Sequence, residues 1–369
     1  MKECPECGKC LDDDQLNCPR DGFPLNVSLK GTRLIDGKYL LERCLGSGAM
    51  GSVYQAKHIE LQKIFALKLI RHSGLSNASY LARFRTEAKA LGKLQHPNVV
   101  QVTDYGIDPR NRGIPYLVME YLEGMTLFHH IRAKGYLAIE EALPLLESIA
   151  SALDYAHSCG ILHRDLKLTN IFLVEDISGR QQVKILDFGL ARIKAEHPVR
   201  GKRAISQRLR QGIYYDRLQE ETETLALAID NKNDSSQVRP SSSPLSGLQK
   251  EKIDRLTQSG TVMGTPGYIA PEIFRGHEAT TVSDIYSFGV VVYEVLIGCQ
   301  PFRGSRAQII YQHTYESPRF PSAEQFAVPK ELDQAILEPL NNEPNMRPNK
   351  AMDVVRNLKE AYARYRYRI

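Results

Sequence analysis

The spacing of apolar residues divides the chain into a strand-rich part and a helical part. Between residues 39 and 114, short apolar runs predict mostly strands, of which Lys63–Ile70 is the clearest. Within that region, Ala78–Leu94 places apolar or small residues at helical spacing. Further along, Ala142–His157 and Asp284–Ile297 are long apolar segments suited to buried helices. The pattern therefore predicts a mainly β part followed by a mainly α part.

Two segments lack such periodicity. Residues 1–27 are rich in cysteine and in turn-forming residues, and residues 28–38 resemble a linker leading into the first strand. Residues 191–256 are rich in Ser, Gln, Arg and Lys and cannot bury much apolar surface, so we expect them to be largely mobile. A short helix at Glu220–Ile229 is the one element expected there.

Charge and composition exclude several classes of protein. The net charge of +5 over 369 residues is mild, so it suits an anionic ligand but is equally explained by a solvated surface. No apolar run is long enough for a membrane span, and the first residues lack the apolar core of a signal peptide, so we expect a cytoplasmic protein. Residues 1–27 contain three basic and six acidic residues, which argues against nucleic-acid binding.

A glycine-rich pattern opens the strand-rich part. It is G-x-G-x-x-G-x-V, formed by Leu45, Gly46, Ser47, Gly48, Ala49, Met50, Gly51, Ser52 and Val53. Glycines allow a hairpin to close over phosphates and to offer bare N–H groups. A dinucleotide-binding fold would need a helix after this pattern, whereas a strand continues from Val53. Lys68 on the next strand could bind phosphates, and Glu87 on the following helix could hold it in place; alone, each would be read as a solvated surface residue.

Several later motifs occur in a fixed order. They are His163-Arg164-Asp165-Leu166-Lys167-Leu168-Thr169-Asn170, then Asp187-Phe188-Gly189, Ala270-Pro271-Glu272 and Asp284-Ile285-Tyr286-Ser287-Phe288-Gly289. This ordered set resembles the eukaryotic-type protein kinases, most closely the serine/threonine kinases of that type found in bacteria. The resemblance covers about residues 36–365.

The resemblance implies a fold and a domain organisation. The fold is α+β with two lobes, a small β-rich N-lobe at residues 39–121 and a larger helical C-lobe at residues 122–366. Both follow the cysteine-rich module at residues 1–27 and the linker at 28–38. The stretch from Asp187 to Glu272 is longer than is usual in the family, so residues of about 195–250 are interpreted as an insertion in the activation segment. The insertion could regulate the enzyme, bind a partner, or do neither.

The resemblance also assigns catalytic roles. Asp165 matches the base that accepts the proton of the substrate hydroxyl, and Lys167 would neutralise charge on the transferring phosphoryl group. Asn170 and Asp187 would hold two Mg²⁺ ions, for which Mn²⁺ is an alternative, while Lys68 would bind the α- and β-phosphates of ATP. The implied reaction transfers the γ-phosphoryl group to serine or threonine of protein substrates.

The implied ATP site draws on both lobes. The glycine-rich residues 45–51 would cover the phosphates, Val53 and Ala66 would form the roof over the adenine, and Phe172 would form its floor. Met119 falls at the gatekeeper position, with Glu120 and Tyr121 as hinge backbone. Ordinary core packing also explains the apolar residues among them, and one residue can both pack in the core and contact the adenine.

Some features bear on specificity and activation. Lys167, together with Thr265 in Gly264-Thr265-Pro266-Gly267-Tyr268, resembles the serine/threonine subclass, and Thr265 is expected to contact Asp165 and Lys167. Arg347 matches the family arginine that pairs with Glu272. Kinases with an arginine at the position of Arg164 commonly use it to clamp a phosphorylated residue, and the best candidates for that residue are Thr257 and Ser259.

The clustered cysteines predict a metal site in the first residues. Cys4-Pro5-Glu6-Cys7-Gly8 and Cys18-Pro19-Arg20-Asp21-Gly22 are two similar knuckles that resemble a small zinc ribbon. The second knuckle has Asp21 where a cysteine is expected, so the fourth ligand is either Asp21 or Cys10. An unmetallated tail is the alternative. The module or the insertion could also bind a protein partner, and a pseudokinase or a zinc-dependent signalling scaffold is the alternative to an active kinase.

Overall fold

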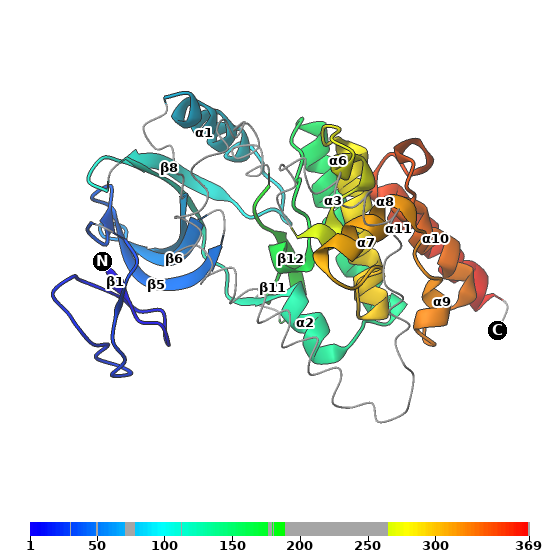
Figure 1. The fold of residues 1–369 in the computed structure, drawn as a ribbon, viewed down its shortest axis with the longest axis horizontal. Helices are drawn as coiled ribbons and strands as arrows, with labels where there is room; N and C mark the ends of the chain where they lie inside the picture. Colours follow the sequence, from blue (N-terminus) through cyan, green and yellow to red (C-terminus); the bar gives the residue numbers. More distant parts are fainter. Residues whose placement is uncertain are drawn as a thin grey trace.

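The computed structural model describes residues 1–29, 31–48, 51–70, 78–111, 113–175, 179, 181–188 and 265–367. It has two lobes side by side along its longest axis, with the two chain termini at opposite ends (Figure 1). The expected insertion at 195–250, the expected helix at Glu220–Ile229 and the expected phosphorylation sites Thr257 and Ser259 lie outside the described residues.

The N-lobe is built on a six-stranded antiparallel sheet with strand order β4-β5-β6-β7-β9-β8. The strands are β4 Leu34–Ile35, β5 Tyr39–Gly48, β6 Gly51–His58, β7 Ile64–Ile70, β8 Val102–Asp108 and β9 Ile114–Glu120. One helix, α1 (Ala78–Leu91), contacts β8 and β9. The strand predicted at Lys63–Ile70 is confirmed as β7. The predicted helix Ala78–Leu94 is also confirmed, although α1 ends at Leu91, before Gly92, and Leu94 enters the core from a turn.

The C-lobe is mainly helical. Its only sheet among the described residues has the order β10-β11-β12, with β10 Gly124–Thr126, β11 Ile171–Glu175 and β12 Gln181–Ile185. Its helices are α2 Leu127–Lys134, α3 Ile139–Ser158, α6 Pro271–Phe274, α7 Thr281–Ile297, α8 Arg306–Tyr315, α9 Pro321–Glu324, α10 Asp333–Leu337 and α11 Ala351–Arg366. The two buried helices predicted from apolar runs are confirmed as α3 and α7. No helix in the described ranges is both long and apolar enough to cross a membrane.

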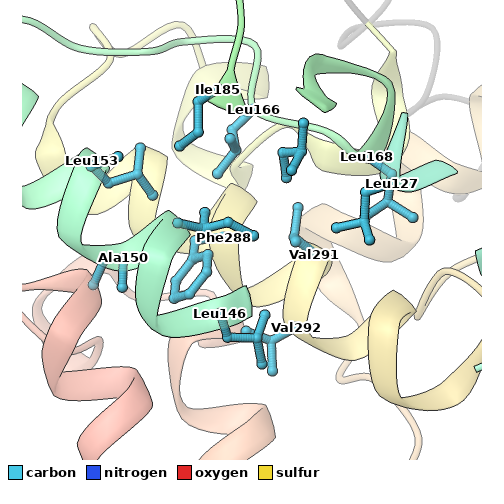
Figure 2. Packing of buried hydrophobic residues seen from close by; sticks show 14 of the residues in the cluster. Leu127, Leu146, Ala150, Leu153, Leu166, Leu168, Ile185, Phe288, Val291 and Val292 are labelled. Carbon is cyan, nitrogen blue, oxygen red and sulfur yellow. The ribbon is translucent and has the colours of Figure 1, made fainter. Parts of the chain in front are cut away.

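Helix α7 forms the centre of the C-lobe. Nearly every residue of it is buried, a capping box of Thr280 and Ser283 starts it, and Gly298 ends it in the left-handed conformation. Figure 2 shows residues of α3 facing α7, with residues of the 166–185 region above them: Leu146, Ala150, Leu153, Phe288, Val291, Val292, Leu166, Leu168 and Ile185. The segment that carries the predicted catalytic residues is therefore fixed by apolar packing on the α3–α7 pair.

The first residues form a small sheet against the N-lobe. Its strands are β1 Lys2–Glu3, β2 Cys10–Leu11 and β3 Asn26–Val27, in the order β2-β1-β3. Met1 and Cys10 are buried in the same hydrophobic cluster as residues of the N-lobe sheet. Within the expected linker, β4 pairs with β5 and adds a strand to that sheet. The domain boundaries themselves stay a prediction.

Candidate active site

The loop between α3 and β11 assembles Asp165, Lys167 and Asn170. The Lys167 ammonium lies 3.1 Å from the Asp165 carboxylate and donates to the Thr265 hydroxyl at 3.4 Å. The side-chain nitrogen of Asn170 donates to the backbone oxygen of Asp165 at 2.8 Å. A 3-10 turn, Leu168–Asn170, follows directly, so Asn170 and Asp165 are held by local backbone geometry. The expected contact of Thr265 with Lys167 is confirmed.

Asp284, at the start of α7, holds the backbone of this loop through hydrogen bonds. Its carboxylate accepts hydrogen bonds from the backbone N–H groups of His163 at 2.7 Å and Arg164 at 2.8 Å, and from the His157 ring at 2.8 Å. Burial alone would raise the pKa of Asp284, but the hydrogen bond from His157 and its nearby charge hold that pKa below its usual range. The ionised carboxylate stabilises Arg164 at a φ of 66°, a left-handed conformation that is unfavourable for a residue other than glycine.

Lys68 and Asp187 meet across the two lobes. The Lys68 ammonium on β7 lies 2.6 Å from the Asp187 carboxylate, which follows β12. Burial would raise the pKa of Asp187, whereas the Lys68 charge lowers it below the ordinary value, so Asp187 is ionised. Asp187 also has a left-handed φ of 61°. Glu87 lies half-buried on α1, and its expected pairing with Lys68 stays a prediction.

Most residues expected around the nucleotide lie on adjacent strands of the N-lobe sheet, in the order β5-β6-β7-β9. The β5–β6 hairpin brings Ser47 opposite Ser52, and their hydroxyls are 2.9 Å apart. In the sheet register Val53 pairs with Lys68 on β7. Ala66 on β7 pairs with Met119 on β9, and Phe172 lies on β11 of the C-lobe sheet. The hairpin contains Leu45, Gly46, Gly48 and Gly51, whereas Ala49 and Met50 are outside the described residues.

The Glu120 side chain has contacts that the sequence did not suggest. The family resemblance implied a role only for the backbone of Glu120 and Tyr121, at the hinge. The Glu120 carboxylate, however, lies 2.8 Å from the Lys184 ammonium on β12. It also accepts from the backbone N–H of Gln101 at 2.8 Å. Glu120 therefore links β9 of the N-lobe to β12 of the C-lobe at the connection between them. The signal in the sequence was weak, because one acidic residue after an apolar strand is usually solvated.

A buried ion pair confirms a further prediction. Arg347 and Glu272 form two parallel hydrogen bonds of 2.8 Å, and both side chains are almost completely buried. Ser283 on α7 donates to the same carboxylate at 2.7 Å. Burial would raise the pKa of Glu272, but the Arg347 hydrogen bonds lower it. The pair joins the segment after Thr265 to the C-lobe core.

A separate cluster of side chains lies where the two N-terminal knuckles meet. Cys4, Cys7, Cys18 and Asp21 each offer one atom, and these atoms all lie within 4.8 Å of one another. The Sγ atoms of Cys7 and Cys18 are 3.8 Å apart, and Asp21 lies 3.3 Å from Cys4 and 3.4 Å from Cys18. Cys10 is not in this cluster, because it is fully buried in the apolar cluster of the N-lobe.

Comparison with known proteins gives a consistent result. The family model described as "Protein kinase domain" matches residues 39–207 and 247–362. The serine/threonine-protein kinase PknB of Mycolicibacterium smegmatis is 32% identical over 322 residues, which are 87% of this chain and 42% of PknB. The serine/threonine-protein kinase PrkC of Bacillus subtilis is 32% identical over 331 residues, or 89% of this chain and 41% of PrkC. The chain thus spans about two fifths of the length of these curated relatives.

Among solved structures, the Mycobacterium tuberculosis PknI kinase domain superposes with a TM-score of 0.58. The two are 22% identical, and the alignment covers 90% of this chain and all of the PknI chain. Rad53 residues 1–466, solved in complex with AMP-PNP, superposes with the same TM-score at 24% identity, covering 87% of this chain and 64% of Rad53. At these identities the likeness speaks to the two-lobed fold alone.

Proposed function

The chain belongs to the protein kinase family, and from that premise we propose that it is a serine/threonine protein kinase that transfers the γ-phosphoryl group of ATP to protein hydroxyls. The observation that carries the proposal is the convergence of two groups of side chains. Lys68 and Asp187 form an ion pair between the lobes, and Asp165, Lys167 and Asn170 contact one another on the loop beside it.

Asp165 and Lys167 serve the acceptor side of the reaction. The Asp165 carboxylate accepts the proton of a serine or threonine hydroxyl as its oxygen attacks phosphorus. Lys167 lies close enough to neutralise charge on the transferring group, and its bond to Thr265 fixes the segment on which the substrate would lie. Because Asp284 immobilises the backbone at 163–164, Asp165 is preorganised for this role.

Lys68 and the metal-binding residues serve the nucleotide side. The family implies ATP with Mg²⁺ or Mn²⁺, and the donor set fits: Asp187 supplies a carboxylate, and Asn170 donates through its nitrogen and keeps its amide oxygen as a ligand. When bound, the ions neutralise negative charge on the phosphates. Lys68 binds the α- and β-phosphates, and Glu87 positions Lys68.

The adenine would lie between the lobes. Val53 and Ala66 contribute its roof from β6 and β7, and Phe172 contributes its floor from β11. The residues that follow Met119 at the end of β9 supply backbone hydrogen bonds, and the bond between Glu120 and Lys184 holds that connection in place. The glycine-rich turn, residues 46–51, covers the phosphates.

Phosphorylation of the activation segment would raise activity. The buried Nε of Arg164 has no hydrogen-bond partner among the described residues, so the guanidinium has a donor left for a phosphate. A phosphate near Arg164 would add charge-assisted hydrogen bonds and order the segment. Thr257 and Ser259 are the proposed sites.

The two N-terminal knuckles would together hold one Zn²⁺ ion through Cys4, Cys7, Cys18 and Asp21. In a tetrahedral site with Zn–S bonds of about 2.3 Å, two sulfurs lie about 3.8 Å apart, which matches the separation of Cys7 and Cys18. Of the two candidates for the fourth ligand, Asp21 is favoured because Cys10 is buried elsewhere. The ion would supply folding energy to a segment with few apolar residues of its own.

A transfer assay tests the proposed activity. The purified chain, γ-labelled ATP and Mg²⁺ are incubated with a panel of proteins, and the labelled amino acids are identified after hydrolysis. Label on serine and threonine, on the chain itself or on the added proteins, is the expected result. A chain that binds a non-hydrolysable ATP analogue but transfers no label to any protein would support the pseudokinase alternative.

A further inference from the structure

The first knuckle contacts the strand that leads into the glycine-rich turn. The backbone N–H of Cys44 on β5 donates to the oxygen of Gly8 at 2.7 Å. The Nε of Arg43 donates to the oxygen of Cys7 at 3.1 Å, and Lys9 pairs with Arg43 in an antiparallel bridge. The turn that contains two of the proposed zinc ligands, Cys4 and Cys7, is thus bonded directly to β5.

Buried contacts support the same attachment. Met1 and Cys10 have almost no exposed surface and lie in one hydrophobic cluster with Leu41 of β5 and Tyr54 of β6. The Tyr54 hydroxyl donates to the Glu3 carboxylate at 2.7 Å. Because β5 and β6 are the two strands of the glycine-rich hairpin, the first residues contact both of them.

The contact lies close to the phosphate-covering turn. Only Leu45 separates Cys44 from Gly46, the first glycine of the motif. The β5–β6 register shifts between Cys44 and Gly46, so the hairpin is irregular where the knuckle is attached. Beyond this point Leu45–Gly48 are exposed, so on the β5 side the knuckle is attached just before the exposed part of the hairpin. The β6 side, in contrast, stays paired with β7 as far as Gly51.

We propose that the first knuckle is a positioning element for nucleotide binding: it clamps the stem of the glycine-rich hairpin at Cys44, and the metal ion keeps the clamp in shape. A hairpin held in place loses less conformational entropy when it closes over ATP. This inference rests on the proposed zinc and ATP sites. It assigns the segment before β4 a role in nucleotide affinity.

Two glycines provide a matched pair of variants. Gly8 and Gly22 occupy equivalent places in the two knuckles, with φ of +71° and +73°, and each N–H donates to the oxygen of the knuckle's first cysteine. An alanine Cβ at Gly8 would lie 2.6 Å from the Cys44 oxygen, whereas at Gly22 it would meet nothing within 4 Å. Gly8→Ala and Gly22→Ala therefore share the same local strain, but only Gly8→Ala pushes the knuckle away from β5.

The measurements are zinc content, the Kd of a non-hydrolysable ATP analogue with Mg²⁺, and hydrogen exchange of the amides at 44–48. Gly8→Ala should keep its zinc, weaken analogue binding about three- to tenfold and speed exchange at Cys44. Gly22→Ala should resemble the parent chain in all three. If Gly8→Ala is not recovered folded, Tyr54→Phe, which removes only the hydroxyl that bonds Glu3, should shift the Kd in the same direction.

Metal removal gives an independent readout. Stripping zinc with a chelator, followed by readdition of Mg²⁺, should speed exchange at 44–48 and weaken analogue binding, and added zinc should restore both. Parent-like binding and exchange in Gly8→Ala, or equal weakening in Gly22→Ala, would overturn the inference. So would verified loss of zinc with no change at 44–48. A chain that shows these effects but transfers no phosphate would refute the proposed activity and leave the clamp standing.

Discussion

Asp284→Asn is expected to separate catalysis from nucleotide binding. One Asp284 oxygen accepts from Arg164 N–H, and the other accepts from His163 N–H and from the His157 ring. An asparagine side chain has nearly the same shape, but only one of its two terminal atoms can accept. In either orientation its NH₂ group would face a backbone N–H, so two donors would oppose each other in a buried site.

The expected loss of stability follows from these contacts. At least one hydrogen bond to a charged group disappears, worth about 1.5–3 kcal/mol. The left-handed backbone at Arg164 also loses support, and such a conformation costs roughly 1–2 kcal/mol. We expect a destabilisation of about 2–4 kcal/mol. Because Asp165 follows Arg164 directly, its carboxylate should be misplaced, and kcat should fall about 10- to 100-fold.

The assay compares Asp284→Asn with a control at another buried carboxylate. Asp333 on α10 accepts from the Ser322 N–H at 2.8 Å and from the Ser322 hydroxyl at 2.6 Å. Asp333→Asn should lower stability in chemical denaturation without changing kcat at a temperature where the variant is folded. The Kd of the ATP analogue should stay within about twofold of the parent value in both variants. Unchanged kcat in a folded Asp284→Asn chain would refute the reasoning.

Three further predictions concern stability and regulation. Arg347→Met should destabilise the fold by about 3–5 kcal/mol in denaturant, because it leaves the Glu272 charge buried without its partner; adding Glu272→Gln should recover part of the loss. Burial raises the pKa of Glu294 from 4.5 to about 7, so between these pH values the folded chain holds a proton that the unfolded chain has released. The free energy of unfolding should therefore fall as pH rises from about 4.5 to 7. Glu294→Gln should flatten this pH dependence in denaturation curves, and an unchanged slope would contradict the assignment. Thr257→Ala combined with Ser259→Ala should lower activity, with mass spectrometry locating the phosphates in the parent chain; undiminished activity would show that the segment is controlled in another way.

The sequence predicted the core elements well because their signals are local. The run at Asp284–Ile297 is long and mostly apolar, and it became α7, whose residues are nearly all buried. The pairing of Arg347 with Glu272 and the contact of Lys167 with Thr265 followed from motif resemblance, and both are present. The α7 signal lies in one continuous run, whereas the two pairings join motifs 75 and 98 residues apart and were available only through the family resemblance.

Contacts between distant segments that no family motif includes were harder to predict. Nothing near Glu120 in the sequence points to Lys184, which lies on a strand of the other lobe. Spacing alone left Cys10 and Asp21 equivalent as ligands; what separates them is that Cys10 packs under the N-lobe sheet. The attachment of Gly8 to Cys44 likewise depends on how two elements meet in space, and no local periodicity encodes it.

Asp165→Asn tests the central claim most directly. The amide keeps the size of the carboxylate and can still accept from Asn170, which lies 3.3 Å away, but it cannot take the proton of a hydroxyl. Single-turnover transfer of labelled phosphate to a protein acceptor is measured beside the Kd of the ATP analogue. We predict that transfer falls by more than about 100-fold while the Kd stays within about twofold. Transfer by Asp165→Asn at the parent rate would contradict the account.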